Sequence, residues 1–115
     1  FDKIIELYKK ADIVTFVSTY EGFGQPIIEA NATGRAVITS NLSSMPEVAN
    51  DAALLVDPFN IEQIREAVIK LINNDKLRVE LIKKGLENVK RFEVGVIAKK
   101  YYNLYEKIMN DNEKN

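Results

Sequence analysis

The chain has 115 residues, enough for one domain but not two, and its 46% hydrophobic and 29% charged residues are typical of a globular protein. Its 16 basic and 17 acidic residues give a net charge of -1, which offers no reason to expect nucleic acid as a partner. Cysteine and histidine are both missing, which excludes disulfide frameworks, thiol catalysis and any triad, general base or metal site built on those side chains.

Helical and strand-like patterns alternate along the chain. Helical segments carry apolar residues every three or four positions, whereas the strands are short continuous apolar runs, typical of strands buried on both faces. In chain order we predict a helix over 2–11, a strand over 13–17, a helix from Pro26 to Gly34, a strand over 36–39, a helical turn around 46–48, a strand over 53–56, a helix capped by Asn60, a helix capped by Asp75, and a final helix over 90–109. Gly85, inside the penultimate helix, is expected to cost about 1 kcal/mol relative to alanine.

Strands that alternate with helices indicate an α/β fold with a parallel sheet. Three strands are few for a parallel sheet that needs both faces covered, so we expect a partial doubly wound, Rossmann-like sheet. The sequence begins at Phe1 without Met and already inside a periodic segment, so we expect it to be part of a longer protein. No secretory signal is visible, and no run approaches the roughly 18 apolar residues needed to span a bilayer.

The loop that follows the first predicted strand holds the densest group of candidate functional residues. Gly22 and Gly24 let the backbone approach a ligand closely, and the start of the next helix favours an anion such as phosphate. Glu21 precedes the glycines and Glu29 lies about one turn into the helix, where carboxylates can accept hydrogen bonds from hydroxyls. This pattern predicts a site for a phosphate-linked, hydroxyl-rich ligand. The spacing alone also allows an idle loop and an acidic residue that only compensates the helix dipole.

Residues 21–30, EGFGQPIIEA, resemble the signature of the family 4 retaining glycosyltransferases, the group 1 glycosyltransferases of GT-B fold. In that family two glutamates stand eight positions apart around a Gly-Phe-Gly turn. The resemblance continues through residues 34–40 (GRAVITS), 46–48 (PEV) and 51–58 (DAALLVDP). It implies that residues 1–115 form the C-terminal half of the second GT-B domain, which binds the nucleotide-sugar, and that residues 90–109 form a C-terminal crossover helix.

The resemblance also implies a role for each residue of the loop. Glu29 would hold the ribose hydroxyls of a nucleotide-sugar donor, and Glu21 would contact the transferred sugar as the catalytic residue. Gly22, Phe23 and Gly24 would present backbone amides to the sugar and the diphosphate. Family members of this hexosyltransferase type transfer the sugar with retention and without a metal, and the sequence has no Asp-x-Asp motif. We therefore expect no metal site and no cofactor, the donor being a substrate.

Part of the family's machinery lies outside the matched segment. A basic pair that neutralises the diphosphate and the acceptor-binding domain both come earlier in family members, so we expect this chain alone to have little or no activity. The expected partners are the nucleotide-sugar and the N-terminal domain of the same enzyme, with self-association through the final helix and no nucleic acid. Basic pairs on the last helices suggest a cytoplasmic enzyme that touches the inner face of a membrane, although solvated helix faces have the same pattern.

Three other functions stay open at this stage. The first is a non-catalytic α/β module that binds a nucleotide or phosphate, which would not recognise nucleotide and sugar together. The second is a glycoside hydrolase that uses Glu21 and Glu29 as its carboxyl pair, which would require the two carboxyls to face each other about 5 to 9 Å apart. The third is a structural fragment with an idle loop, which would associate without binding a ligand.

Overall fold

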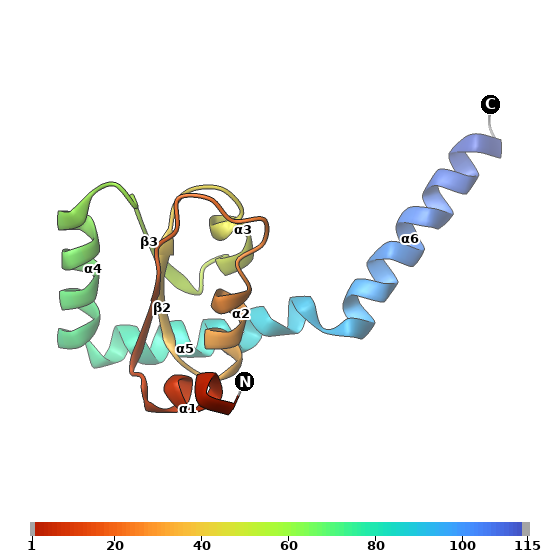
Figure 1. Cartoon of the computed structure of the whole chain (residues 1–115). Coiled ribbons are helices and arrows are strands. Elements are labelled where there is room, and N and C mark those ends of the chain that lie inside the picture. Colours follow the sequence, from red (N-terminus) through yellow and green to blue (C-terminus); the bar gives the residue numbers. More distant parts are fainter. Residues whose placement is uncertain (1, 114–115) are drawn as a thin grey trace.

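The computed structural model describes residues 2–113 and has a three-stranded sheet covered by helices on both faces (Figure 1). The elements are, in chain order, α1 (Asp2–Lys10), β1 (Ile13–Phe16), α2 (Gln25–Ala32), β2 (Ala36–Ser40), α3 (Met45–Ala49), β3 (Ala53–Val56), α4 (Ile61–Asn73), α5 (Asp75–Val89), the 3₁₀ turn η1 (Lys90–Phe92) and α6 (Val94–Glu113). The strand order is β1-β2-β3, and both neighbouring pairs are parallel. The predicted α/β fold with a parallel sheet is confirmed.

The central strand β2 is buried along its whole length, and its alternate side chains enter two cores. On one face Val37 packs with Ile27 of α2 and Met45 of α3. On the other face Ile38 packs with Leu71 of α4 and with residues of α5. Figure 1 shows α4 on one side of the sheet and α2 with α3 on the other. Burying each of these side chains contributes about 1.5–3 kcal/mol. Because β2 supplies side chains to both cores, it is the element that joins them.

Asparagine side chains cap the two long helices that follow β3. Asn60 Oδ1 accepts a hydrogen bond from the Gln63 backbone N–H at 3.1 Å, as the sequence predicts. The predicted cap of α5 is wrong by one residue, because Asn74 takes that position and accepts from the Leu77 N–H at 3.0 Å. Asn and Asp are about equally good caps, and Asp75 in the first turn compensates the helix dipole instead.

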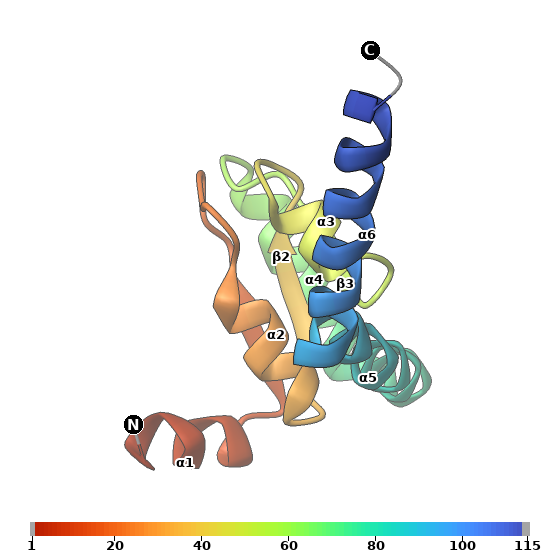
Figure 2. The ribbon, with the colours of Figure 1, turned by 90° about the vertical axis from the view of Figure 1, so that its right-hand side faces the viewer.

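The last helix leads away from the rest of the molecule. Where the sequence predicts one helix over 90–109, the structure has η1 and then α6, separated by Glu93 in an extended conformation. No residue of α6 is buried, and both views show it projecting from the body (Figures 1 and 2). Apolar residues of α6 such as Ile97, Tyr101 and Leu104 are therefore exposed. α6 therefore exposes the apolar surface that self-association would require. Self-association itself stays a prediction.

None of the helices formed by residues 2–113 combines the length and the apolar content that a bilayer crossing requires.

Gly85 lies where α5 packs against Asn31 of α2. A Cβ added to Gly85 would lie 2.8 Å from Asn31 Nδ2 and 3.1 Å from Asn31 Cγ. Asn31 is completely buried, and its Oδ1 accepts from Asn88 Nδ2 at 2.9 Å. Asn88 also donates to the Val48 carbonyl at 2.8 Å, so one amide joins α5 to α2 and α3. The low helix propensity of this glycine is offset by the close approach that it permits.

We expect Gly85→Ala to lower the free energy of unfolding by about 1–2 kcal/mol. Overpacking costs typically about 1–3 kcal/mol, which exceeds the gain of up to about 1 kcal/mol in helix propensity. Urea denaturation followed by circular dichroism measures this change. Gly95→Ala is the matched control, because a Cβ at Gly95 would meet nothing within 4 Å and should leave stability equal or slightly higher. Equal stability of Gly85→Ala and the wild type would contradict the packing account.

Candidate functional site

The loops that follow the three strands lie together at one edge of the sheet. Residues 17–24 connect β1 to α2, residues 41–44 connect β2 to α3, and residues 57–60 connect β3 to α4. Because the strands are parallel, their carboxyl ends share an edge, and both views show the three loops gathered there (Figures 1 and 2). In open α/β sheets this is the edge at which ligands bind. The predicted site residues of the β1–α2 loop therefore stand at the expected place.

The two glycines of the β1–α2 loop differ in what surrounds them. Gly24 is buried at the start of α2 with φ 99°, and a Cβ there would lie 3.2 Å from Ile27 Cδ1 and 3.7 Å from Phe16 Cε1. The left-handed backbone and the close packing both require glycine at this position. Pro26 follows in the first turn, where its missing N–H costs nothing. Gly22 is exposed and a Cβ there would meet nothing within 4 Å, so its backbone is open to a ligand.

Two serines of the neighbouring loop hold the backbone around Gly22, and sequence reasoning missed them. Ser43 Oγ donates to the Glu21 carbonyl at 2.8 Å and accepts from the Glu21 N–H at 3.3 Å. Ser44 Oγ lies 2.9 Å from the carbonyl oxygens of both Glu21 and Phe23. The available signal was the polar run 40–44 after the second strand, because parallel neighbours place that run beside the first loop.

The side chain of Phe23 anchors the same loop from a third direction. Its ring meets the Phe92 ring of η1 edge to face, with the centroids 5.5 Å apart. The Arg91 guanidinium lies 5.1 Å from the centroid of Phe92 and donates to the Glu47 carbonyl of α3 at 3.2 Å. Edge-to-face pairs contribute about 0.5–1.5 kcal/mol beyond the area that they bury. The loop position is thus set by η1 as well as by the strands.

Glu29 is held by a residue of the first helix. The Tyr8 hydroxyl donates to Glu29 Oε2 at 2.8 Å across a partly buried contact. Burial, followed by the hydrogen bond and the negative charge of Glu29, raises the pKa of Tyr8 to about 12. One carboxylate oxygen of Glu29 is engaged, and its other oxygen can accept from a ligand.

Glu21 and Glu29 are both half-buried, and different parts of the fold hold them. Glu21 lies in the loop, where the hydrogen bonds between residues 2–113 reach its backbone only. Its carboxylate therefore has no competing protein donor among the described residues. Glu29 lies in the second turn of α2 and faces Tyr8. Among residues 2–113, Glu29 is therefore held through its carboxylate and Glu21 through its backbone.

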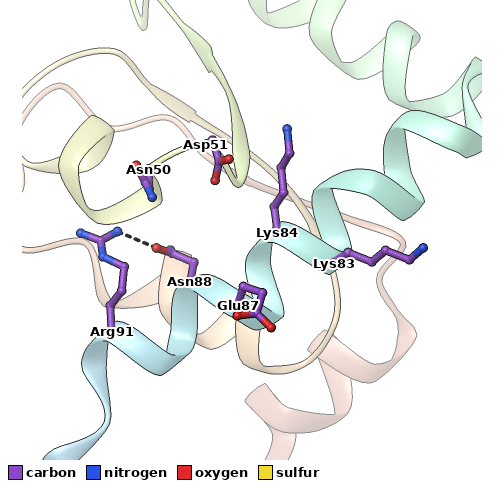
Figure 3. Close-up of a pocket in the computed structure, with 7 residues that line it drawn as sticks. All are labelled: Asn50, Asp51, Lys83, Lys84, Glu87, Asn88 and Arg91. Atoms are coloured by element: carbon purple, nitrogen blue, oxygen red, sulfur yellow. Dashed lines mark hydrogen bonds between the residues drawn. The ribbon is translucent and has the colours of Figure 1, made fainter. Parts of the chain in front are cut away.

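A separate cavity of about 360 Å³ lies at the opposite edge of the sheet, between α5 and the turn before β3 (Figure 3). Its lining consists of Asn50, Asp51, Lys83, Lys84, Glu87, Asn88 and Arg91. Several of its charged groups already have partners. Arg91 donates to Asn88 Oδ1 at 2.6 Å, Lys84 pairs with Glu80 at 2.9 Å, and Glu87 pairs with Lys90 at 2.8 Å. This cavity contains none of the predicted site residues.

Comparison with known proteins adds three findings. The sequence profile of the family described as "Glycosyl transferases group 1" matches residues 2–88. The O-antigen chain mannosyltransferase B of Escherichia coli is 38% identical over 86 residues, which are 75% of this chain and 23% of that protein. A solved glycosyltransferase from Rickettsia africae superposes with a TM-score of 0.77 at 26% identity, covering 95% of this chain and 30% of that one.

A further match is to an isolated domain. The solved C-terminal domain of a group 1 glycosyltransferase from Francisella tularensis superposes with a TM-score of 0.73 at 33% identity. The match covers 81% of this chain and 49% of that domain. The chain therefore spans less than a third of the two longer relatives and about half of the solved C-terminal domain.

We expect Glu29→Gln to lower the pKa of Tyr8 from about 12, but not fully to its ordinary value of 10.0, because burial remains. The ring ¹³Cζ shift of Tyr8, assigned with Tyr8→Phe, measures this titration. The raised pKa also means that the folded state holds the tyrosine proton more tightly than the unfolded state. Its contribution to stability is complete below pH 10 and is lost as the pH rises through 12. An unchanged titration in Glu29→Gln would show that the carboxylate does not act on Tyr8.

Proposed function

This chain belongs to the group 1 glycosyltransferases, and on that premise we propose that it forms one wall of a nucleotide-sugar site in an enzyme that transfers the sugar to an acceptor. The observation that carries the proposal is the placing of two glutamates around a glycine turn at the carboxyl edge of β1, directly before α2. That edge and that helix start are suited to a diphosphate with a sugar on each side.

In this proposal each part of the β1–α2 segment meets a different part of the donor. Glu29 accepts hydrogen bonds from the ribose hydroxyls through the carboxylate oxygen that Tyr8 leaves available. The backbone amides of Gly22, Phe23 and Gly24, together with the positive end of the α2 dipole, face the diphosphate. Glu21 contacts hydroxyls of the transferred sugar. Both ends of the donor are recognised, which a simple phosphate-binding module would not achieve.

In the proposed chemistry, the bond between the anomeric carbon and the diphosphate oxygen breaks, a bond forms from that carbon to a hydroxyl oxygen of the acceptor, and the hydroxyl proton is released with the nucleoside diphosphate. Negative charge develops on the leaving oxygen of the diphosphate and positive charge on the sugar ring. Amides at the start of α2 stabilise the negative charge on the leaving oxygen, and the Glu21 carboxylate stabilises the positive charge on the sugar ring. We propose that transfer proceeds with retention of anomeric configuration and without a metal, on the strength of the family resemblance of residues 21–30.

The proposed whole enzyme is larger than this chain. The E. coli relative is more than four times as long as the matched segment, which is consistent with a preceding domain that carries the acceptor site and basic groups for the diphosphate. We propose that this chain alone is inactive. The name of that relative, an O-antigen chain mannosyltransferase, supports a role in polysaccharide synthesis. The basic pairs on the last helices are what supports a cytoplasmic enzyme at the inner face of a membrane.

Ligand-observed saturation transfer NMR tests donor binding, with UDP, GDP, UDP-glucose and GDP-mannose as probes. We expect transfer to the ribose protons in the wild-type chain and a roughly tenfold weaker affinity in Glu29→Ala, because hydrogen bonds to charged groups contribute about 1.5–3 kcal/mol. Glu66→Ala, which removes an exposed glutamate of α4, is the matched control. Equal saturation transfer to the ribose protons in Glu29→Ala and Glu66→Ala would show that Glu29 does not contribute to donor binding. Binding of inorganic phosphate with no gain from nucleotide or sugar would favour the non-catalytic module.

Glu21→Gln separates transfer from binding in the full-length enzyme. We expect its kcat to fall about 100-fold or more with little change in donor KM, because the lost charge acts mainly in the transition state. Steady-state assays of donor consumption measure both constants. Hydrolysis of a simple aryl glycoside that disappears in Glu21→Gln would instead support a glycoside hydrolase.

A further inference from the structure

We infer that Ser43 and Ser44 are positioning residues of the donor site, whose hydroxyls hold the backbone on both sides of Gly22. The inference rests on the proposed function, because it concerns the loop that carries Glu21. It adds a second loop, between β2 and α3, to the parts of the chain on which donor binding depends. Neither hydroxyl needs to touch the donor for this role.

The hydroxyls reach both carbonyl groups that flank Gly22. Ser43 Oγ and Ser44 Oγ lie 2.8 and 2.9 Å from the Glu21 carbonyl oxygen, which has two lone pairs to accept both. Ser44 Oγ lies 2.9 Å from the Phe23 carbonyl as well. The Glu21 N–H donates to Ser43 Oγ at 3.3 Å. Both backbone polar groups of Glu21 are therefore paired with a serine hydroxyl.

Ser44 lies at the start of α3, where a serine side chain usually caps the helix. It occupies the N-cap position of α3, but its side chain makes no capping hydrogen bond. Asn60 and Asn74, at the corresponding positions of α4 and α5, both cap their helices. A serine at an N-cap normally accepts from the N–H two or three residues later. The Ser44 hydroxyl donates to the β1–α2 loop instead, so its contribution goes to the loop and not to the helix.

Ser43 has an unusual backbone conformation for its type. Its φ is 58°, in the left-handed region that glycine adopts without strain and other residues rarely adopt. Strained positions of this kind persist where the surrounding contacts hold them, and they cluster at functional sites. Glycine would relieve the strain but would lose both contacts to Glu21. The serine hydroxyl is the part of this residue that a glycine cannot replace.

The contacts of Ser43 and Ser44 with the loop, called the serine clasp or simply the clasp below, matter because no hydrogen bond among residues 2–113 reaches Gly22 itself. A Cβ there would meet nothing within 4 Å, and glycine has the widest choice of backbone conformations. Beyond it, Phe23 is fixed by the Phe92 ring. Fixing the Glu21 backbone at the other end removes the freedom of the glycine between them. A donor then meets a loop that is already ordered, and it does not have to supply the ordering entropy.

Three variants of the chain test the clasp. Ser44→Ala removes a hydroxyl that reaches two backbone carbonyls, and Ser44→Thr retains it. Thr33→Ala is the matched control, because Thr33 Oγ1 likewise reaches two carbonyls, at 2.9 and 3.1 Å, at the far end of α2. ¹⁵N relaxation of the Glu21, Gly22 and Phe23 amides reports loop order, the thermal midpoint reports stability, and saturation transfer from UDP-glucose and GDP-mannose reports binding.

We expect Ser44→Ala to lower the order parameters of the loop amides from about 0.85 to below about 0.6. Ser44→Thr should restore them and Thr33→Ala should leave them unchanged. Saturation of the donor sugar protons should fall several-fold in Ser44→Ala alone. Ser43→Gly should disorder the loop with no loss of thermal midpoint, since relief of strain offsets the lost contacts, and a purely structural role would not produce that combination.

Failure of the serine clasp and failure of the proposed donor site give different results. Loop amides as ordered in Ser44→Ala and Ser43→Gly as in the wild type would overturn the clasp, whatever the chain binds. If the serine variants lower the loop order but the wild-type chain shows no saturation transfer from either donor, the clasp is supported and the proposed donor site is contradicted. If Ser44→Ala fails to fold, Ser44→Thr and Ser43→Gly still decide the first question.

Discussion

The structure depends on one buried strand. β2 has no exposed residue, and it pairs in parallel with β1 on one side and β3 on the other. Its alternate side chains hold two helical layers, so removing it would separate both cores. The same pairing sends all three carboxyl ends to one edge. The constraint that makes the fold stable therefore also brings the three loops of that edge together.

Tertiary contacts then fix a loop that its own sequence leaves free. The β1–α2 loop is held by serines of the next loop, by an aromatic contact from η1 and by the burial of Gly24 at the start of α2. Glu29 is held separately, by Tyr8 of α1. Because only Glu93 separates η1 from α6, the aromatic contact also holds the start of the projecting helix near the loop. The loop backbone and the Glu29 carboxylate are thus held by different neighbouring elements, as a preorganised site requires.

Most of the fold is predictable from local patterns, whereas the supports of the site are not. Short apolar runs and helical spacing identify the three strands and the helices between them, because both reflect burial of a repeating face. The side-chain contact of Tyr8 with Glu29 and that of Ser43 with Glu21 join residues 21 and 22 positions apart, so no local pattern reports them. Gly85 shows the same limit, since its effect on helix propensity is visible in the sequence but its packing partner is not.

Amide chemical-shift mapping of the ¹⁵N-labelled chain with UDP-glucose and with GDP-mannose tests the central claim most directly, namely that the edge formed by the parallel strands is a nucleotide-sugar site. We expect the largest shifts to fall on residues 21–24, on the first turn of α2 and on Glu29. Shifts that gather instead around Asp51, Lys83 and Lys84, in the separate cavity beside α5, would contradict it.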